Sequence, residues 1–267
     1  MPFAEATDGC RLHYEVHGPA DRPVLLIGYP WTDGMAYTLG AMTGEDEMVA
    51  TTMAANRALV EGFAETYRVV HMDYPRGLPP SEGPLDGDLR ADTVASDYVA
   101  IADAAGVDRF VALGYSWSGN AALQVASRTD RCAGVAIGGW PPLSGPYAEI
   151  LGQLQTMIAE LEPDDPVRAF QQMIANYYDS IVGHWDEEAA VAALSGVRIS
   201  FFGADDVGVP ELGLPLALAE LTRSRRSDLE RLGWTVAEFP GHDHMTASLD
   251  AALVIATVTA ALGEQTW

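Results

Sequence analysis

Three side chains that lie far apart in the sequence have the types that hydrolytic acyl transfer needs. Ser116 stands in a glycine-rich turn, and Asp206 and His244 follow it later in the chain. A serine hydroxyl is a weak nucleophile at neutral pH, so it needs a base to take its proton and a third group to orient that base. Histidine and aspartate fill these roles when the three groups meet. The sequence therefore predicts Ser116 as nucleophile, His244 as general base and Asp206 as the orienting carboxylate.

Each of the three residues comes shortly after an apolar run that is typical of a buried β-strand. The runs span residues 110–113, 197–202 and 234–239. Open α/β sheets place their sites just beyond the carboxyl ends of the strands. Because all three runs would end at that edge, we expect Ser116, Asp206 and His244 to lie together there.

The turn 114–119 has the composition that an exposed nucleophile requires. Gly114 lies two residues before Ser116 and Ser118 two residues after it, and both are small. A sharp strand-to-helix turn leaves little room at these two positions. The alternative is that Ser116 is only a small residue of a tight turn, but the later Asp206 and His244 favour the catalytic interpretation. Ser118 is interpreted as a small residue and not as a second nucleophile.

The rest of the chain alternates strand-like and helix-like segments, which indicates a mainly parallel sheet. Further strands are predicted at 12–17, as an early edge strand, and at 24–27, 68–72 and 134–137; helices are predicted at 120–128, at 247–262 and behind a capping Asp92. The predicted class is therefore α/β, with a mainly parallel twisted sheet and helices on both of its faces.

Two segments interrupt this alternation. Residues 143–195 contain no convincing strand, but they carry amphipathic stripes, with Asp165 before Pro166 and Asp186 as helix caps. We predict a small helical insertion there, between two parts of one core, 1–142 and 196–267. A second insertion is expected within residues 31–61, whose length exceeds that of ordinary strand-to-helix loops.

Five segments, taken in order, resemble the α/β-hydrolase superfamily. They are 24–30, 69–81 with Arg76 and Gly77, 114–119, 203–210 and 240–244. The chain order Ser, Asp, His is also that of the family, and the insertion 143–195 falls where the family carries its lid. The chain departs from the family at Ile27, where a histidine is common, and in the extra prolines of segment 73–81. The resemblance implies the α/β-hydrolase fold with a serine nucleophile and a helical lid.

Two backbone N–H groups are predicted to hold the oxyanion. The first belongs to Trp117, the residue after the nucleophile. The second should come from the loop after Gly28, where Pro30 is excluded because proline has no N–H. Tyr29 is the preferred donor, with Trp31 in reserve.

Substrate contacts are expected from Trp31, Tyr115 and Trp140. Most other aromatic residues of the insertion are interpreted as helix faces that pack onto the sheet. They are Tyr147, Phe170, Tyr177, Tyr178 and Trp185.

Neighbouring residues compete for two of the catalytic roles. Asp205 adjoins Asp206, and the family spacing from Gly203 favours Asp206. His242 stands two residues before His244, and the resemblance favours His244. A His-x-His pair can also bind a metal, but no cysteine or third histidine is near it, so we expect no metal.

Composition limits the partners and the cellular location. Apolar residues make up 48% and charged residues 20%, which is typical of a globular domain. A net charge of −23 repels nucleic acid phosphates and anionic lipid, so neither partner is expected. Cys10 and Cys132 are expected to be free thiols, and residues 1–11 carry no signal-peptide pattern. A cytoplasmic protein acting on a small molecule is the default expectation; the oligomeric state stays open.

The triad and the resemblance together predict a serine hydrolase that cleaves a carboxylic ester, thioester or lactone of a small to medium substrate without a cofactor. The Ser116 nucleophile argues against dehalogenase and epoxide hydrolase chemistry, for which relatives use aspartate. Two alternatives stay open. In the first, the same triad hydrolyses C–C bonds of β-diketones or forms peracids. In the second, the chain is a non-catalytic hydrolase-like protein that binds a small ligand; such a protein is expected to lack a triad member, and none is missing here.

Overall fold

A computed structural model describes residues 2–28, 46–72, 74–83, 88–210 and 213–263, and all structural statements below concern these residues. Eight strands form one sheet in the order β1-β2-β4-β3-β5-β6-β7-β10. Their bounds are β1 (Phe3–Glu5), β2 (Arg11–His17), β3 (Val24–Ile27), β4 (Arg68–Met72), β5 (Phe110–Tyr115), β6 (Cys132–Gly138), β7 (Val197–Gly203) and β10 (Thr235–Phe239). A separate antiparallel pair consists of β8 (Gly208–Val209) and β9 (Leu214–Pro215).

The sheet is parallel from β4 to β10 and antiparallel at its β1–β2 end. The mainly parallel sheet is thus confirmed. The prediction that residues 12–17 form the edge strand is wrong, because β1 pairs with the outer side of β2. Three residues, Phe3–Glu5, are too few to give a periodic signal in the sequence.

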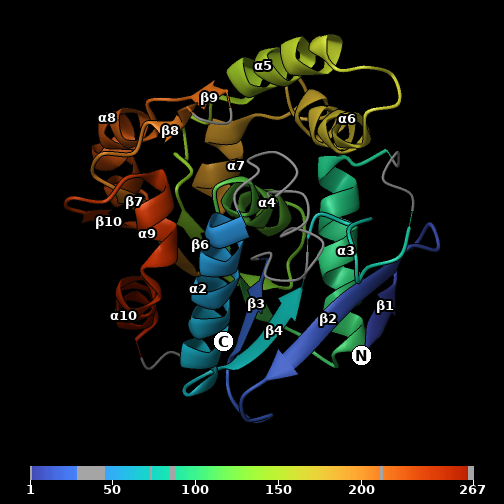
Figure 1. Cartoon of the computed structure of the whole chain (residues 1–267). Helices are drawn as coiled ribbons and strands as arrows, with labels where there is room; N and C mark the ends of the chain where they lie inside the picture. Colours follow the sequence, from blue (N-terminus) through green and yellow to red (C-terminus); the bar gives the residue numbers. More distant parts are fainter. Residues whose placement is uncertain (1, 29–45, 73, 84–87, 211–212, 264–267) are drawn as a thin grey trace.

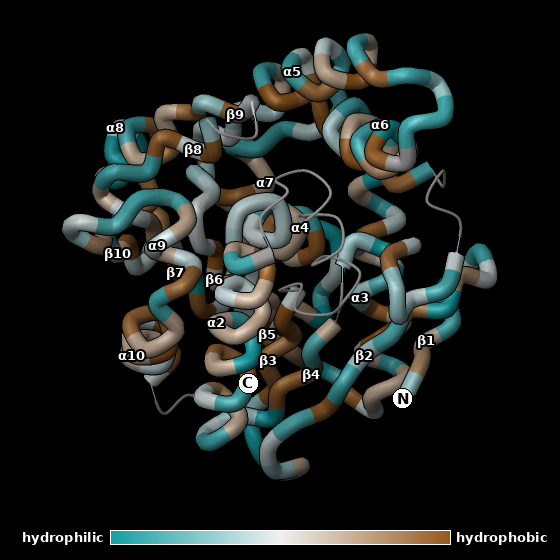
Figure 2. The backbone as a smooth tube through the Cα atoms, in the orientation of Figure 1, coloured by the Kyte–Doolittle hydropathy of each residue, from teal (hydrophilic) through white to brown (hydrophobic). Residues whose placement is uncertain are grey.

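Helices cover both faces of the sheet, because successive side chains of each central strand point to opposite faces. Leu25 and Ile27 of β3 pack with one apolar cluster, and Leu26 packs with the other. The first cluster is covered by α2 (Asp46–Ala64), α9 (His244–Leu249) and α10 (Ala251–Leu262), and the second by α3 (Ala91–Ala104) and α4 (Trp117–Ala126) (Figure 1). Hydrophobic colour accordingly gathers on the central strands in Figure 2.

Two helix predictions need correction, and the predicted insertion 31–61 is described only in part. Asp92 does not cap α3: Arg90 stands at the N-cap without a side-chain bond, and Asp92 lies in the first turn. The predicted helix 247–262 is two helices, because the Asp250 side chain accepts from the N–H of Leu253 and starts α10 anew. The expected insertion 31–61 lies outside the described residues up to position 45, and from Asp46 onward it is the helix α2.

Between β6 and β7 the described chain forms helices and no strand, as predicted. They are α5 (Tyr147–Glu160), α6 (Pro166–Asp179) and α7 (Glu187–Ala193). Asp165 and Asp186 cap α6 and α7 through their side chains, which confirms both predicted caps. Figure 1 shows α5 and α6 side by side at the top, beyond the carboxyl ends of the parallel strands. Helix α8 (Leu218–Arg231) follows later in the chain.

No helix among the described residues is both long and apolar enough to span a bilayer.

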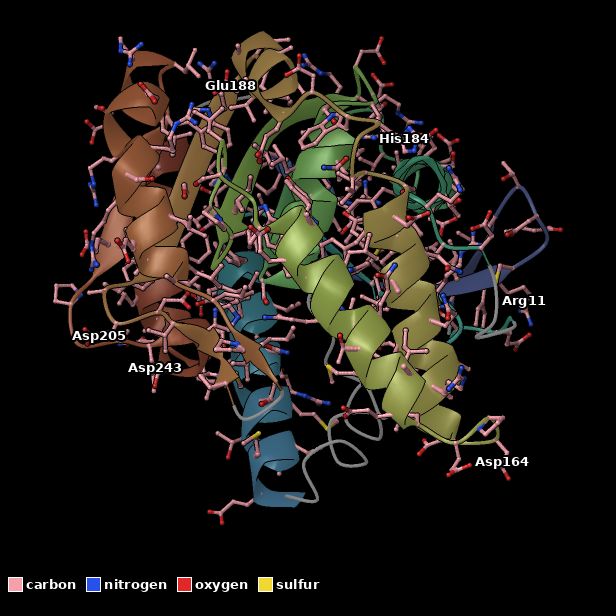
Figure 3. The ribbon with its side chains drawn as sticks, turned by 90° about the horizontal axis from the view of Figure 1, so that it is seen from above. Arg11, Asp164, His184, Glu188, Asp205 and Asp243 are labelled. Atoms are coloured by element: carbon pink, nitrogen blue, oxygen red, sulfur yellow. The ribbon has the colours of Figure 1, made fainter. Side chains whose placement is uncertain are left out.

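The cap of α6 gives a first testable prediction. The Asp165 carboxylate accepts a 2.8 Å hydrogen bond from the N–H of Val167. We expect Asp165→Ala to lower the free energy of unfolding by about 1 kcal/mol, because an N-terminal donor loses its partner. Asp164→Ala is the matched control: Asp164 lies at the exposed tip between α5 and α6 (Figure 3), and its loss should cost less than about 0.5 kcal/mol. Equal shifts in chemical denaturation of the two variants would contradict the cap.

Candidate active site

The structure brings Ser116, His244 and Asp206 into one hydrogen-bonded chain. His244 Nε2 lies 2.9 Å from Ser116 Oγ. On the other side of the ring, His244 Nδ1 lies 2.9 and 3.0 Å from the two carboxylate oxygens of Asp206. The Asp206 and His244 side chains are buried, whereas Ser116 is partly exposed. With Nδ1–H donating to the carboxylate, Nε2 is free to accept the serine proton.

The backbone at Ser116 has the shape of a sharp strand-to-helix turn. Ser116 has φ 54° and ψ −123°, a conformation that is uncommon for a residue with a side chain. It stands between β5 and the first residue of α4, and its N–H donates to Gly138 O at 2.8 Å. Such strained residues persist where the surroundings hold them firmly. The turn thereby presents Oγ at the carboxyl edge of the sheet.

Ser118 holds this turn in shape. Its hydroxyl accepts from the N–H of Tyr115 at 2.9 Å and donates to Tyr115 O at 2.8 Å. Both hydrogen-bonding roles of the hydroxyl are therefore used within the turn, which agrees with the interpretation of Ser118 as a small structural residue.

Asp206 is positioned by the loop that follows β7. Its Oδ1 accepts from the N–H of Gly208 at 2.9 Å, and its carbonyl accepts from the N–H of Ala219 at 3.0 Å. The neighbouring Asp205 is exposed and lies at the periphery (Figure 3). Only Asp206 therefore meets the imidazole, as the family spacing predicts.

His244 is the first residue of helix α9, and the N-cap residue Asp243 fixes the backbone that carries the imidazole. The Asp243 carboxylate accepts from the side chain and the N–H of Thr246, and these hydrogen bonds lower the Asp243 pKa. The Tyr115 hydroxyl donates to His244 O at 2.8 Å, and the two rings lie 5.2 Å apart. Tyr115, predicted to contact substrate, is buried, and its hydroxyl supports the His244 backbone.

His242 has other partners. Its Nδ1 lies 3.0 Å from Pro240 O and its Nε2 3.4 Å from an Asp250 carboxylate oxygen. None of these contacts involves Ser116 or Asp206. No cluster of three metal-binding side chains occurs within the described ranges.

The predicted oxyanion donors are only partly within the described residues. Trp117 is the first residue of α4, so its N–H has no acceptor within the helix. Helix N-termini also favour a developing negative charge. Tyr29 and Trp31 lie outside the described residues.

Aromatic side chains of the insertion gather next to the nucleophile turn. The Tyr177 ring lies 5.1 Å from that of Trp117, and Trp140 packs against Tyr147 at 5.2 Å and Tyr178 at 6.2 Å. Burial raises the pKa values of Tyr147, Tyr177 and Tyr178, so these hydroxyls stay neutral. Trp140, predicted to contact substrate, is itself 3% exposed and forms part of this cluster.

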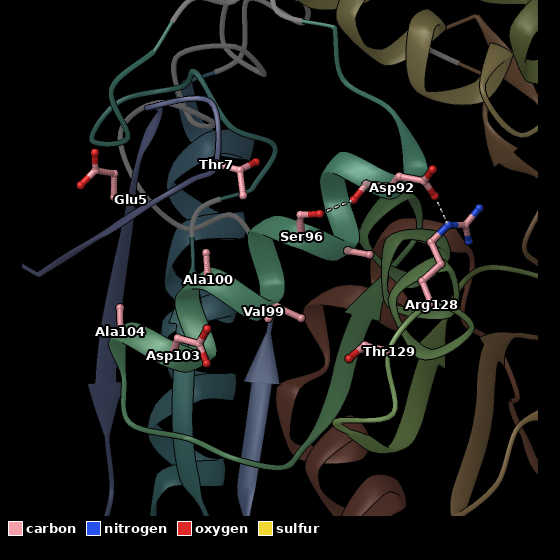
Figure 4. Close-up of a pocket in the computed structure, with 11 residues that line it drawn as sticks. Glu5, Thr7, Asp92, Ser96, Val99, Ala100, Asp103, Ala104, Arg128 and Thr129 are labelled. Carbon is pink, nitrogen blue, oxygen red and sulfur yellow. Dashed lines mark hydrogen bonds and ion pairs between the residues drawn. The ribbon is translucent and has the colours of Figure 1, made fainter.

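A separate surface groove of about 770 Å³ runs along α3. Its lining includes Ala95, Val99, Ala100 and the ion pair between Asp92 and Arg128 (Figure 4). No member of the Ser116 chain lines it, so the groove lies apart from the candidate site.

Comparison with known proteins agrees with the fold. A family model described as alpha/beta hydrolase fold matches residues 49–163. The structure is similar to carboxylesterase CesB from Bacillus subtilis, with 14% identity over 100% of this chain and 92% of that chain and a TM-score of 0.62. It is also similar to an enol-lactonase from Burkholderia xenovorans, with 19% identity over 98% of this chain and 99% of that chain and a TM-score of 0.57. A third similar structure is Epoxide Hydrolase A from Mycobacterium thermoresistibile, with 17% identity over 98% of each chain and a TM-score of 0.58.

The chain has the α/β-hydrolase fold, and part of it matches the model of that family. At these identities the structural matches establish the fold alone. The matched proteins carry the names of different hydrolases, so the reaction must be argued from the site.

The glycine two residues before Ser116 gives a prediction about the turn. A Cβ on Gly114 would lie 2.1 Å from Ser118 O, a backbone atom that cannot move without opening the turn. We expect Gly114→Ala to lower the free energy of unfolding by about 3 kcal/mol, measured by denaturant titration. The control is Gly152→Ala in the exposed part of α5, where nothing lies within 4 Å; it should be neutral or gain about 1 kcal/mol. An unchanged free energy of unfolding in Gly114→Ala would show that the turn can accommodate a Cβ at this position.

Proposed function

We propose that this protein is a serine hydrolase that cleaves a carboxylic ester, thioester or lactone of a small to medium substrate. The observation that carries the proposal is the continuous chain from Ser116 Oγ through His244 to both oxygens of Asp206. The hydrogen-bonded pair of Asp206 and His244 alone could have a purely structural role. A strained, partly exposed serine at the outer end of such a chain is the arrangement that nucleophilic catalysis requires.

The proposed reaction uses each group at a stated atom. His244 Nε2 takes the Ser116 proton as Oγ attacks the substrate carbonyl, and Asp206 stabilises the imidazolium through Nδ1–H. The N–H of Trp117 holds the oxyanion, together with the predicted donor Tyr29. The imidazolium then protonates the leaving group. Water, deprotonated by the same imidazole, then attacks the acyl carbonyl, and the imidazolium returns the proton to Ser116 Oγ as its bond to the acid breaks.

The helices between β6 and β7 are proposed to act as a lid, so that residues 143–195 cover a core made of 1–142 and 196–267. The contact of Tyr177 in α6 with Trp117 supports this role, because it brings the insertion to the residue beside the nucleophile. A small-molecule substrate would then lie between the insertion and the carboxyl edge of the sheet, near Trp140; Trp31 stays a predicted contact outside the described residues.

The nucleophile is tested with a fluorophosphonate probe and a p-nitrophenyl ester. We expect Ser116→Ala to lose labelling and to reduce kcat at least about 10³-fold, because Ser116 Oγ is the hydroxyl that lies within hydrogen-bond distance of His244 Nε2. Ser118→Ala keeps the nucleophile and should still be labelled. Full ester turnover by Ser116→Ala would overturn the assignment. A higher kcat/KM for β-diketones than for esters would keep the triad and change the reaction to C–C bond hydrolysis.

Two adjacent carboxylates provide a matched test of the third residue. Asp206→Asn keeps the size of the side chain but removes its negative charge, which weakens the hydrogen bond from His244 Nδ1–H. We expect kcat to fall about 10³- to 10⁴-fold. Asp205→Asn removes an exposed charge one residue earlier and should leave kcat within about 3-fold. Steady-state kinetics on both variants decides, and equal losses would show that Asp206 has no special role.

A further inference from the structure

Three aromatic rings join the two sides of the proposed oxyanion hole. Tyr98 of α3 meets Tyr74 edge to face, with ring centroids 5.7 Å apart. Tyr74, which follows β4, stacks on Trp117 with centroids 5.8 Å apart and an interplanar angle of 18°. Tyr98 and Tyr74 are both almost completely buried. The row Tyr98–Tyr74–Trp117, which we call the aromatic row, ends at the residue whose N–H is the first proposed donor.

The other end of the aromatic row lies against Gly28. A Cβ built on Gly28 would lie 2.4 Å from the Tyr98 hydroxyl oxygen. That hydroxyl is fully buried and has no hydrogen-bond partner in the described structure. Gly28 follows β3, donates its N–H to Leu113 O at 3.1 Å and directly precedes Tyr29, the second proposed donor. Tyr98 therefore touches the chain where that donor's loop begins.

The middle of the aromatic row is anchored by a buried ion pair. The Tyr74 hydroxyl donates to Asp97 Oδ2 at 2.7 Å, and Arg76 Nε donates to the same oxygen at 2.8 Å. Another guanidinium nitrogen of Arg76 bonds Asp97 Oδ1, and the third bonds Asp8. Burial opposes the charge on Arg76, but the hydrogen bonds and charges of Asp97 and the hydrogen bond to Asp8 together outweigh that cost and raise the Arg76 pKa. A satisfied buried network of this kind is rigid, so the Tyr74 ring has one fixed place.

We propose that Tyr74 and Tyr98 are positioning residues that set the spacing between the Trp117 N–H and the end of β3 at Gly28. The inference rests on the proposed function, because it gives these rings a role only if the two sides hold an oxyanion. Donors of an oxyanion hole must lie about 2.7–3.1 Å from the developing charge, and a misplacement of about 1 Å can cost about 10²-fold in rate. Neither tyrosine needs to touch substrate for this role.

The first experiment separates positioning from core packing. Tyr74→Leu removes the ring that stacks on Trp117, whereas the control Tyr67→Leu removes a buried ring on the opposite face of the sheet. Both variants should lose stability. Only Tyr74→Leu should lower kcat, by about 10- to 100-fold with KM changed less than about 3-fold, and weaken binding of a trifluoromethyl ketone in parallel. Equal kinetic losses in both variants, or unchanged values in Tyr74→Leu, would overturn the proposal.

The second experiment is a rescue, and it stays informative if Tyr74→Leu does not fold. Gly28→Ala creates the 2.4 Å clash with the Tyr98 hydroxyl, whereas the next nearest atoms, Met72 Cε and Tyr98 Cζ, lie 3.5 Å away. Removing the hydroxyl in Gly28→Ala/Tyr98→Phe should therefore recover kcat. We expect a loss of about 10-fold or more in the single variant and recovery to within about 3-fold of the wild type. A double variant as slow as Gly28→Ala would show that Tyr98 does not set this position.

The wild-type protein distinguishes failure of this inference from failure of the proposed function. If the fluorophosphonate probe does not label wild-type Ser116, the hydrolase assignment fails, and with it the oxyanion hole whose spacing the aromatic row is proposed to set. If the wild type is labelled and Tyr74→Leu is labelled at the same rate, the assignment stands and the positioning role is refuted.

Discussion

The imidazole of His244 must lie between two groups that different strands bring to the same edge of the sheet. Its Nδ1 lies 2.9 Å from a carboxylate oxygen of Asp206, after β7, and its Nε2 lies 2.9 Å from Ser116 Oγ, after β5. Such spacing tolerates errors of only a few tenths of an ångström. The surrounding structure meets this demand with local constraints: the strained Ser116 backbone, the capping box at Asp243 and the Tyr115 hydroxyl on His244 O.

Much of the fold was predictable because its signals are local. Buried parallel strands are continuous apolar runs, so the strands that became β3 and β4 were found with the bounds that the structure has. The caps Asp165 and Asp186 were also visible, since a cap acts on residues two or three positions ahead. The meeting of Ser116, Asp206 and His244 followed from one topological rule, that sites of open parallel sheets collect at one edge.

What the sequence did not reveal depends on contacts between distant residues. The hydrogen bond from Tyr115 to His244 spans 129 positions, and the bond from Arg76 to Asp97 spans 21. No pattern of types or spacing marks either pair. The break at Asp250 was missed because apolar periodicity continues across it, and β1 was missed because three residues carry no period. Arg76 is likewise held by Asp8, 68 positions away in the sequence.

The arrangement of supports divides the candidate site into two halves with different origins. The acid–base half, His244 with Asp206, is fixed by α9 and the loops after β7 and β10. The proposed oxyanion half lies on the opposite side of β5, where Tyr98 and Tyr74 pack in a row against Trp117 and the Tyr74 hydroxyl bonds the ion pair of Arg76 and Asp97. The two halves meet at Ser116 and Trp117, which are adjacent in one turn. Under the proposed mechanism, a change in the second half alters how well the transition state is bound while the hydrogen bonds among Ser116, His244 and Asp206 stay intact. For this reason kcat and the binding of a transition-state analogue, and not the geometry of the three residues, report on it.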